Sequence, residues 1–300
     1  MVAQPVTARP RGRENSRSAR VSAGSVLVVP SQQDKVTRFE ELHAGPTPLL
    51  LANPWDEGSA RLLVGAGFQA LATTSGGFAA SLGRQDGQVT RGEALAHARR
   101  VVDAVEVPVS ADLENCFADD PAGVAQTVQG AVEAGLAGCS VEDFTRDASR
   151  PIYDLPLAAE RVAAAAHAAH DGAVRIVLTA RAENYLHGRP DLADTIGRLQ
   201  AYQEAGADVL YAPGLTALDD IRQVVAALDR PVNVLALPSA PAVAELASVG
   251  VRRVSVGSTF TWVAFGGLVE AARELLDAGT YGFFERAGPG RKAAQQAFGG

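Results

Sequence analysis

Short apolar runs alternate with longer amphipathic, alanine-rich segments along most of the chain. The short runs are rich in β-branched residues and predict eight strands, over residues 48–53, 69–75, 107–114, 138–143, 175–181, 209–213, 232–237 and 253–257. The longer segments predict helices over residues 35–44, 59–66, 91–105, 121–134, 157–169, 192–205, 217–228, 240–248 and 262–276. Many of these helices stop at a glycine, as at Gly135 and Gly206, which is the residue type that best ends a helix.

This alternation predicts an α/β fold with a parallel sheet, because a helix must return the chain to the same end of the sheet after each strand. Eight strand–helix units favour a closed (β/α)8 TIM barrel. The alternative is an open doubly wound sheet, which would carry a Gly-x-Gly-x-x-Gly turn after an early strand. The first such turn reads Asn53-Pro-Trp-Asp-Glu-Gly-Ser59 and lacks that pattern, so the barrel is the better prediction.

The two ends of the chain differ from this regular middle. Residues 1–24 are rich in Arg, Ser, Pro and Ala and predict a disordered basic tail, because they hold too little apolar surface to fold. Residues 25–280 would form the barrel, as a single catalytic domain. Residues 281–300 are a C-terminal extension, and its aromatic residues Phe283, Phe284 and Phe298 would pack either on a neighbouring subunit or on the barrel itself.

Composition and charge exclude several classes of protein. A net charge of −7 over 300 residues gives no support for binding nucleic acid, and no apolar run is long enough to span a membrane. The two cysteines lack the spacing of a metal site and favour free thiols in a reducing, cytoplasmic setting. The only lysines, Lys35 and Lys292, lie away from the predicted strand ends, which argues against an aldolase that forms a Schiff base.

Acidic residues gather where two neighbouring strands are predicted to end. The strand over residues 107–114 ends in Asp112 and Glu114, which would point to the same face because side chains two apart in a strand do so. Glu142 ends the next strand, and the active sites of barrels lie at these carboxyl ends. Three carboxylates there suit a hard cation, Mg²⁺ or Mn²⁺. The alternative is a solvated junction between strand and loop that only happens to be acidic.

Groups suited to an anion flank these acids. The second strand ends in hydroxyl groups and unobstructed backbone N–H groups, from Thr74, Ser75, Gly76 and Gly77. Arg181 ends the fifth strand and offers a planar fork for a substrate carboxylate. A divalent cation, an arginine and backbone donors together would stabilise an enolate. Plainer alternatives exist, since two glycines often mark only a turn and Arg181 could serve as a structural ion-pair partner.

In its ordered set of motifs the chain resembles the isocitrate lyase and phosphoenolpyruvate mutase superfamily over about residues 35–280. The motifs are Ser59-Ala-Arg61 with Gly67-Phe68, Ser75-Gly76, Gly83-Arg-Gln-Asp86 with Thr90, Ala111-Asp-Leu-Glu114, Val141-Glu-Asp143, Thr179-Ala-Arg181, Gly206-Ala-Asp208 and Gly250-Val-Arg-Arg-Val-Ser255. The resemblance implies a barrel with a swapped eighth helix and a homodimer or homotetramer. It also implies chemistry assisted by Mg²⁺ on a small 2-oxo acid or its enol.

The resemblance also implies roles for particular residues. Asp112, Glu114 and Glu142 correspond to the metal-binding acids, with Asp112 closest to the ion. Asp86 corresponds to an aspartate at the rim near the waters of the metal, and we expect it to be catalytic together with Arg181 and Glu142. The groups that hold the oxo-acid carboxylate and the enolate oxygen correspond to Ser75, Gly76 and Arg181.

The chain departs from the superfamily pattern after the fourth strand. Lyases of this group carry a Lys-Lys-Cys-Gly-His-like loop there, and the phosphonomutases carry a Lys and an Asn. The corresponding loop here, residues 144–151, has none of these residues, so we do not expect isocitrate or methylisocitrate lyase activity. Cys116 stands where relatives usually have glycine, and either a catalytic thiol or a merely tolerated small residue would explain it. Cys139 is expected to be buried against the helices.

The expected activity is that of an Mg²⁺-dependent lyase or decarboxylase. It would cleave a C–C bond in a small 2-oxo or 2-hydroxy dicarboxylate through a pyruvate-like enolate. One alternative is P–C chemistry, as in phosphoenolpyruvate mutase or phosphonopyruvate hydrolase. Another is a catalytically reduced barrel that acts as a binding or assembly protein.

Overall fold

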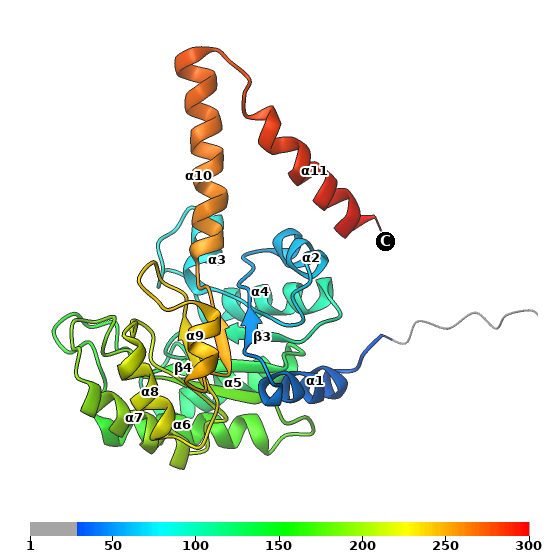
Figure 1. The fold of residues 1–300 in the computed structure, drawn as a ribbon. Coiled ribbons are helices and arrows are strands. Elements are labelled where there is room, and N and C mark those ends of the chain that lie inside the picture. Colours follow the sequence, from blue (N-terminus) through cyan, green and yellow to red (C-terminus); the bar gives the residue numbers. More distant parts are fainter. Residues whose placement is uncertain (1–28, 300) are drawn as a thin grey trace, which may run out of the picture.

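The computed structural model describes residues 29–299 and confirms the predicted (β/α)8 barrel (Figure 1). Eight parallel strands pair in the order β1-β8-β7-β6-β5-β4-β3-β2. Their bounds are Leu49–Leu51 (β1), Leu71–Ala72 (β2), Val109–Asp112 (β3), Gly138–Glu142 (β4), Val177–Arg181 (β5), Val209–Tyr211 (β6), Val232–Leu235 (β7) and Arg253–Ser255 (β8). The basic tail predicted over residues 1–24 lies outside the described residues.

The barrel closes between β1 and β2 with little backbone pairing. A single parallel bridge joins Ala52 to Leu71 at this seam. The buried amide of Asn53 supports the seam, because its nitrogen donates to the carbonyl of Thr73 at 3.1 Å. Its oxygen accepts from the two backbone N–H groups that follow β8, at 3.1 and 3.0 Å. One side chain therefore connects β1 to both β2 and β8.

Helices surround the strands largely where the sequence predicts them. Their bounds are Gln32–Ala44 (α1), Glu57–Gly65 (α2), Ser75–Ser81 (α3), Arg91–Ala104 (α4), Pro121–Glu133 (α5), Leu155–His170 (α6), Leu192–Glu204 (α7), Leu218–Ala226 (α8), Val243–Ser248 (α9), Thr259–Arg273 (α10) and Phe284–Phe298 (α11). Capping side chains set several of the starts. Asp56 accepts a hydrogen bond from the backbone N–H of Ser59 at 2.6 Å, so α2 begins two residues earlier than predicted.

Helix α10 leaves the barrel as a long arm, and α11 runs back from its tip (Figure 1). A π-helical turn, η1 (Glu274–Ala278), continues α10. Large apolar side chains along the arm are exposed, among them Trp262, Val263, Leu268, Val269 and Leu276. Helix α11 packs against α2, so the C-terminal extension does contact the barrel of its own chain. None of the helices built from residues 29–299 combines the length and apolarity needed to cross a membrane.

Candidate active site

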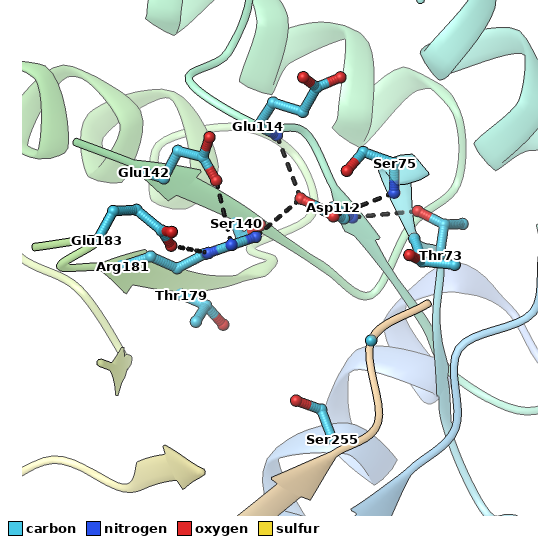
Figure 2. A network of polar contacts seen from close by, with 12 residues as sticks. Thr73, Ser75, Asp112, Glu114, Ser140, Glu142, Thr179, Arg181, Glu183 and Ser255 are labelled. Carbon is cyan, nitrogen blue, oxygen red and sulfur yellow. Dashed lines mark hydrogen bonds and ion pairs between the residues drawn. The ribbon is translucent and has the colours of Figure 1, made fainter. Parts of the chain in front are cut away.

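A cavity of about 210 Å³ opens at the carboxyl ends of the strands. Residues from all eight strands line it, with Asp86 and Ser258 from the loops above. Of the predicted site residues, Thr74, Ser75, Asp86, Asp112 and Arg181 line the cavity, and Glu114 and Glu142 lie next to it (Figure 2). This is the end of a barrel where active sites form, because the loops that follow the strands can vary without disturbing the core.

Asp112 stands at the centre of the polar network (Figure 2). Its Oδ2 accepts a hydrogen bond from the backbone N–H of Ser75 at 3.1 Å. Its Oδ1 accepts from Arg181 Nη1 at 3.0 Å and from the backbone N–H of Glu114 at 3.3 Å. The carboxylate thus ties the end of β3 to the end of β5 and to the first residue of α3.

Glu114 does not belong to the strand in which it was predicted. Strand β3 ends at Asp112, and Glu114 adopts a left-handed backbone conformation with φ of 53°. The side-by-side projection expected of residues two apart in a strand is therefore wrong for this pair. Glu114 nevertheless lies beside Asp112, because the tight turn brings its backbone N–H onto that carboxylate. Cys116 and Phe117 also have positive φ, which marks a strained turn made without glycine.

Burial raises the pKa of Glu114 to about 7, and repulsion from Asp112 adds to this effect. An ion pair with Arg146 opposes it. Glu142 is buried as well, and burial raises its pKa well above the ordinary value, with repulsion from Glu183 contributing in the same direction. These acids therefore hold protons more tightly than exposed carboxyls do, unless a cation comes near.

Arg181 supplies the main positive charge of the site. Its Nη1, Nη2 and Nε lie 3.0, 3.2 and 2.7 Å from carboxylate oxygens of Asp112, Glu142 and Glu183, respectively. Its guanidinium also lies 5.3 Å from the centre of the Tyr211 ring. In this arrangement Arg181 is an ion-pair partner of three acids, and its role toward a substrate carboxylate remains a prediction.

The two glycines after β2 belong to the first turn of the short helix α3, which the sequence did not predict. Thr74 caps this helix, and its hydroxyl lies 2.7 Å from that of Ser258. A Cβ atom on Gly76 would lie 2.8 Å from Ser258 Oγ, and one on Gly77 would lie 2.5 Å from Thr261 Oγ1. The helix therefore packs so closely on the loop after β8 that side chains at these positions would clash.

Asp86 lies over the start of α3, as predicted for a residue at the rim. Its carboxylate is close to Gly76 and accepts a hydrogen bond from the backbone N–H of Gly87 at 3.1 Å. Burial of the carboxyl group, followed by repulsion from Asp112, raises its pKa. Asp86 is thus a candidate proton donor at the mouth of the cavity.

The loop over residues 144–151 contributes a functional group that the prediction overlooked. Arg146 forms an ion pair with Glu114, and its Nη1 donates to the carbonyl of Gly87 at 3.3 Å. Phe144 stacks on His187 with ring centres 3.7 Å apart, which anchors the base of the loop. The sequence showed an arginine in this loop, but only the fold shows that it reaches the acids after β3.

Neither cysteine is available for chemistry at the cavity. Cys116 and Cys139 are both completely buried. Burial raises the pKa of Cys116 well above its ordinary value, and its sulfur lies 3.9 Å from the carbonyl oxygen of Ser140. Of the two explanations for Cys116, this environment agrees with a tolerated small residue that packs behind β4.

The donor set of the site fits a hard divalent cation. Asp86 and Asp112 line the cavity, and Glu114, Glu142 and Glu183 lie next to it in the same polar network. Arg181 pairs with Asp112, Glu142 and Glu183, and Arg146 pairs with Glu114. Carboxylate oxygens are the ligands that Mg²⁺ prefers, and Mg²⁺ usually keeps several waters. Within residues 29–299 no three acidic, His or Cys side chains are arranged for direct chelation. A cation here would therefore bind largely through water.

Comparison with known proteins agrees with this geometry. A family model described as Phosphoenolpyruvate phosphomutase matches residues 39–276. A proposed lyase/mutase from Burkholderia cenocepacia J2315 has a similar crystal structure, with a TM-score of 0.85 and 48% sequence identity over 88% of this chain and 96% of that chain. The 2-methylisocitrate lyase of Escherichia coli strain K12 is 34% identical over 62% of this chain and 64% of its own. The oxaloacetate decarboxylase of Chromohalobacter salexigens is 28% identical, over 84% and 88% respectively.

The fold is that of a barrel enzyme, and its candidate active site is an acidic cavity at the carboxyl ends of the strands. The chain belongs to the phosphoenolpyruvate phosphomutase family, within the isocitrate lyase/PEP mutase superfamily. The predicted resemblance is confirmed, and the chain is an enzyme of this type.

Proposed function

We propose that this enzyme is an Mg²⁺-dependent lyase or decarboxylase that cleaves a C–C bond in a small 2-oxo or 2-hydroxy dicarboxylate through a pyruvate-like enolate. The observation that carries the proposal is the network around Asp112, which accepts hydrogen bonds from Arg181 and from the N–H of Ser75. Beside it lie two buried acids with raised pKa, Glu142, which pairs with Arg181, and Glu114, which pairs with Arg146. Such a site places positive charge and fixed donors where an enolate oxygen would develop.

Asp112 would hold the cation directly, and Glu114 and Glu142 would hold it through water. Bound there, Mg²⁺ would act as a Lewis acid that polarises the substrate carbonyl and stabilises the enolate. Arg181 Nη1 now donates to Asp112 and would turn to the carboxylate next to that carbonyl. The Ser75 backbone N–H and hydroxyl would orient the same end of the substrate.

Both thiols are buried, so neither is available to supply the proton that completes the reaction. In a 2-oxo acid the electron pair of the broken C–C bond becomes the enolate, and a proton is then added to carbon. Asp86 lines the cavity and has a raised pKa, so it is the group we assign to this transfer. A carboxyl group in this role also agrees with the loop over residues 144–151, which lacks the cysteine found in the corresponding loop of the methylisocitrate lyases.

P–C chemistry on a phosphonopyruvate-like compound is the second candidate, and the family match supports it. It would use the same enolate, with a phosphoryl group as the part that leaves. Phosphorus NMR with phosphonopyruvate distinguishes the two. Conversion of phosphonopyruvate at a rate comparable with the best C–C substrate would favour this candidate over the first.

We expect oxalate, a planar mimic of the pyruvate enolate, to bind only together with Mg²⁺, and the binding to strengthen with pH. Glu114 must lose its proton to face a cation, so this group alone should make the affinity for Mg²⁺ rise about tenfold per pH unit below 7. Calorimetry in buffers of different ionisation enthalpy measures the released protons. Glu114→Gln should weaken this rise without abolishing it, because Glu142 also has a raised pKa, and a flat profile in the unaltered enzyme would contradict the assignment.

The raised pKa of Glu114 also makes the stability of the metal-free protein depend on pH. The Glu114 carboxyl loses its proton near 4.5 in the unfolded chain and near 7 in the folded one. The folded state therefore holds the proton more tightly, and this group favours folding at low pH. Its contribution is lost as the pH rises from 4.5 to about 7.

We further propose that the exposed apolar side of α10 is covered by a second copy of the chain, in a homodimer or homotetramer with a swapped eighth helix. The arm stands away from its own barrel and exposes several large apolar side chains, which is typical of an interface (Figure 1). Leu268→Glu with Leu276→Glu should shift the protein to monomer in sedimentation experiments. An unchanged mass for the variant, or a monomeric unaltered protein, would contradict this proposal.

A further inference from the structure

The floor of the cavity holds a second arginine, Arg253, at the start of β8. It lines the cavity and is only 4% exposed. Its Nε donates to Asn233 Oδ1 at 3.0 Å, and Nη1 and Nη2 each lie 3.1 Å from Thr179 Oγ1. Nη1 also lies 3.4 Å from the Nε2 atom of His43, which comes from α1 beneath the barrel.

Among residues 29–299, the side-chain partners of this guanidinium include no carboxylate. Its neighbours are an amide, a hydroxyl and an imidazole. Burial, together with the charge of Arg253, lowers the pKa of His43 to about 4, so that imidazole is neutral at physiological pH. Burial lowers the pKa of Arg253 to about 10, which still leaves it charged. A buried charge is normally paired, because desolvating it alone costs several kcal/mol.

The two arginines of the cavity differ in this respect. Arg181 faces three acids at the rim, whereas the groups between it and Arg253 are neutral. Those groups are mostly hydroxyls, from Ser140, Thr179, Tyr211 and Ser255. Thr179 and Ser255 face the open space beneath the Arg181 network (Figure 2). The cavity therefore passes from an acidic mouth to a cationic floor, through walls that can donate hydrogen bonds.

We propose that Arg253 forms an anion subsite that binds the second carboxylate of the substrate, the one remote from the carbonyl or hydroxyl carbon. This inference rests on the proposed function, since it needs a substrate whose first carboxylate is held at the rim. A small acid with two carboxylates would then span the cavity, with one end at Arg181 and the other at Arg253. The second carboxylate would then be the negatively charged partner of Arg253.

The subsite also selects between the two reactions. A carboxylate that leaves as carbon dioxide loses its negative charge, and a guanidinium that binds it would oppose this change. Cleavage of a C–C bond between the two carboxylates instead leaves the second carboxylate charged on the departing fragment. Arg253 would then keep its ionic partner throughout the reaction. The geometry thus favours a lyase whose second carboxylate is retained on the departing fragment.

Matched ligand pairs test the subsite. In the presence of Mg²⁺, racemic malate is compared with racemic 2-hydroxybutyrate, and 2-oxoglutarate with 2-oxovalerate, by calorimetry. Within each pair the ligands differ by a carboxylate in place of a methyl group. A charge-assisted contact predicts that the better dicarboxylate binds about 10- to 100-fold more tightly than its partner.

Two variants remove the charge in different ways. Arg253→Met deletes it, and Asn233→Asp, which is nearly isosteric, places a carboxylate where the amide oxygen accepts from Arg253 Nε. In both variants the dicarboxylate should bind no more tightly than its partner, so that the ratio of the two affinities is about one. Arg253→Lys should keep part of the difference. Arg252→Met is the matched control, because the side chain of this neighbouring arginine is exposed and donates to the carbonyl of Gly45, outside the cavity.

Oxalate separates the two levels of the proposal. It is too short to span the cavity, so its affinity should be unchanged in every variant. Two results would disprove the subsite while oxalate still binds and the proposed function stands. In one, Asn233→Asp and Arg253→Met still bind the dicarboxylate more tightly than its partner. In the other, the unaltered enzyme shows no such preference for either pair. If oxalate does not bind the unaltered enzyme with Mg²⁺, the proposed function itself fails. Should Arg253→Met not fold, Asn233→Asp alone decides.

Discussion

Replacing Asp112 by Asn should lower turnover by about 10²–10³-fold or more, because one change removes the central charge of the site. Asp112 accepts hydrogen bonds from Ser75, Arg181 and Glu114, so its carboxylate sets the position of groups on three elements. It is also the acid we assign to the cation. Asparagine keeps the shape but carries an amide nitrogen that cannot accept from Arg181 or bind a cation.

The assay follows the best substrate of a panel of 2-oxo and 2-hydroxy dicarboxylates, with saturating Mg²⁺. Asp103→Asn serves as the control, because Asp103 is exposed and pairs with Arg99 on the outside of α4. Its turnover should be unchanged. Turnover of Asp112→Asn within threefold of the unaltered enzyme would show that the carboxylate takes no part in the reaction.

Replacing Arg181 by Met should cost about 3–5 kcal/mol of the free energy of unfolding near pH 8, in addition to abolishing turnover. The change leaves Asp112, Glu142 and Glu183 without the cation that lies between them. Glu142 and Glu183 are buried and their pKa values are already raised, so they would take up protons as the pH falls. The loss should therefore be smaller near pH 5, and added Mg²⁺ should recover part of it near pH 8.

Urea denaturation at both pH values, with and without Mg²⁺, measures these differences. Arg99→Met is a suitable control, since its exposed ion pair with Asp103 contributes less than about 1 kcal/mol. If Arg181→Met costs no more than this control, the three acids do not depend on Arg181 for their charge balance. If the cost does not change with pH, they do not titrate as their burial implies.

The regular part of the fold could be predicted because each unit repeats the same two patterns. Apolar β-branched runs marked the strands, and glycines marked the ends of many helices. Helix α3 was missed because two of its first three residues are glycines, which have low helix propensity. Its close packing on Ser258 and Thr261 overrides that propensity, and no local pattern reports such a contact. Helix α11 was missed because two glycines and Pro289 lie within its sequence.

The site could be predicted only as far as strand ends determine it. Asp112, Glu142 and Arg181 end consecutive strands, so their meeting followed from the barrel. The turn that delivers Glu114 uses positive φ at residues other than glycine, which spacing cannot reveal. The interactions of Arg146 and Arg253 depend on side chains far away in the sequence. Arg253 contacts Thr179, for example, across 74 positions.

The central claim is that the rim around Asp112 and Arg181 stabilises a pyruvate-like enolate with the help of Mg²⁺. Exchange of the methyl protons of pyruvate with D₂O, followed by proton NMR, tests this directly, because exchange requires that enolate. The account predicts that the methyl signal disappears with enzyme and Mg²⁺, persists when Mg²⁺ is chelated, and persists with Asp112→Asn. A methyl signal that persists with the unaltered, Mg²⁺-loaded enzyme, or exchange that needs neither Mg²⁺ nor Asp112, would contradict it.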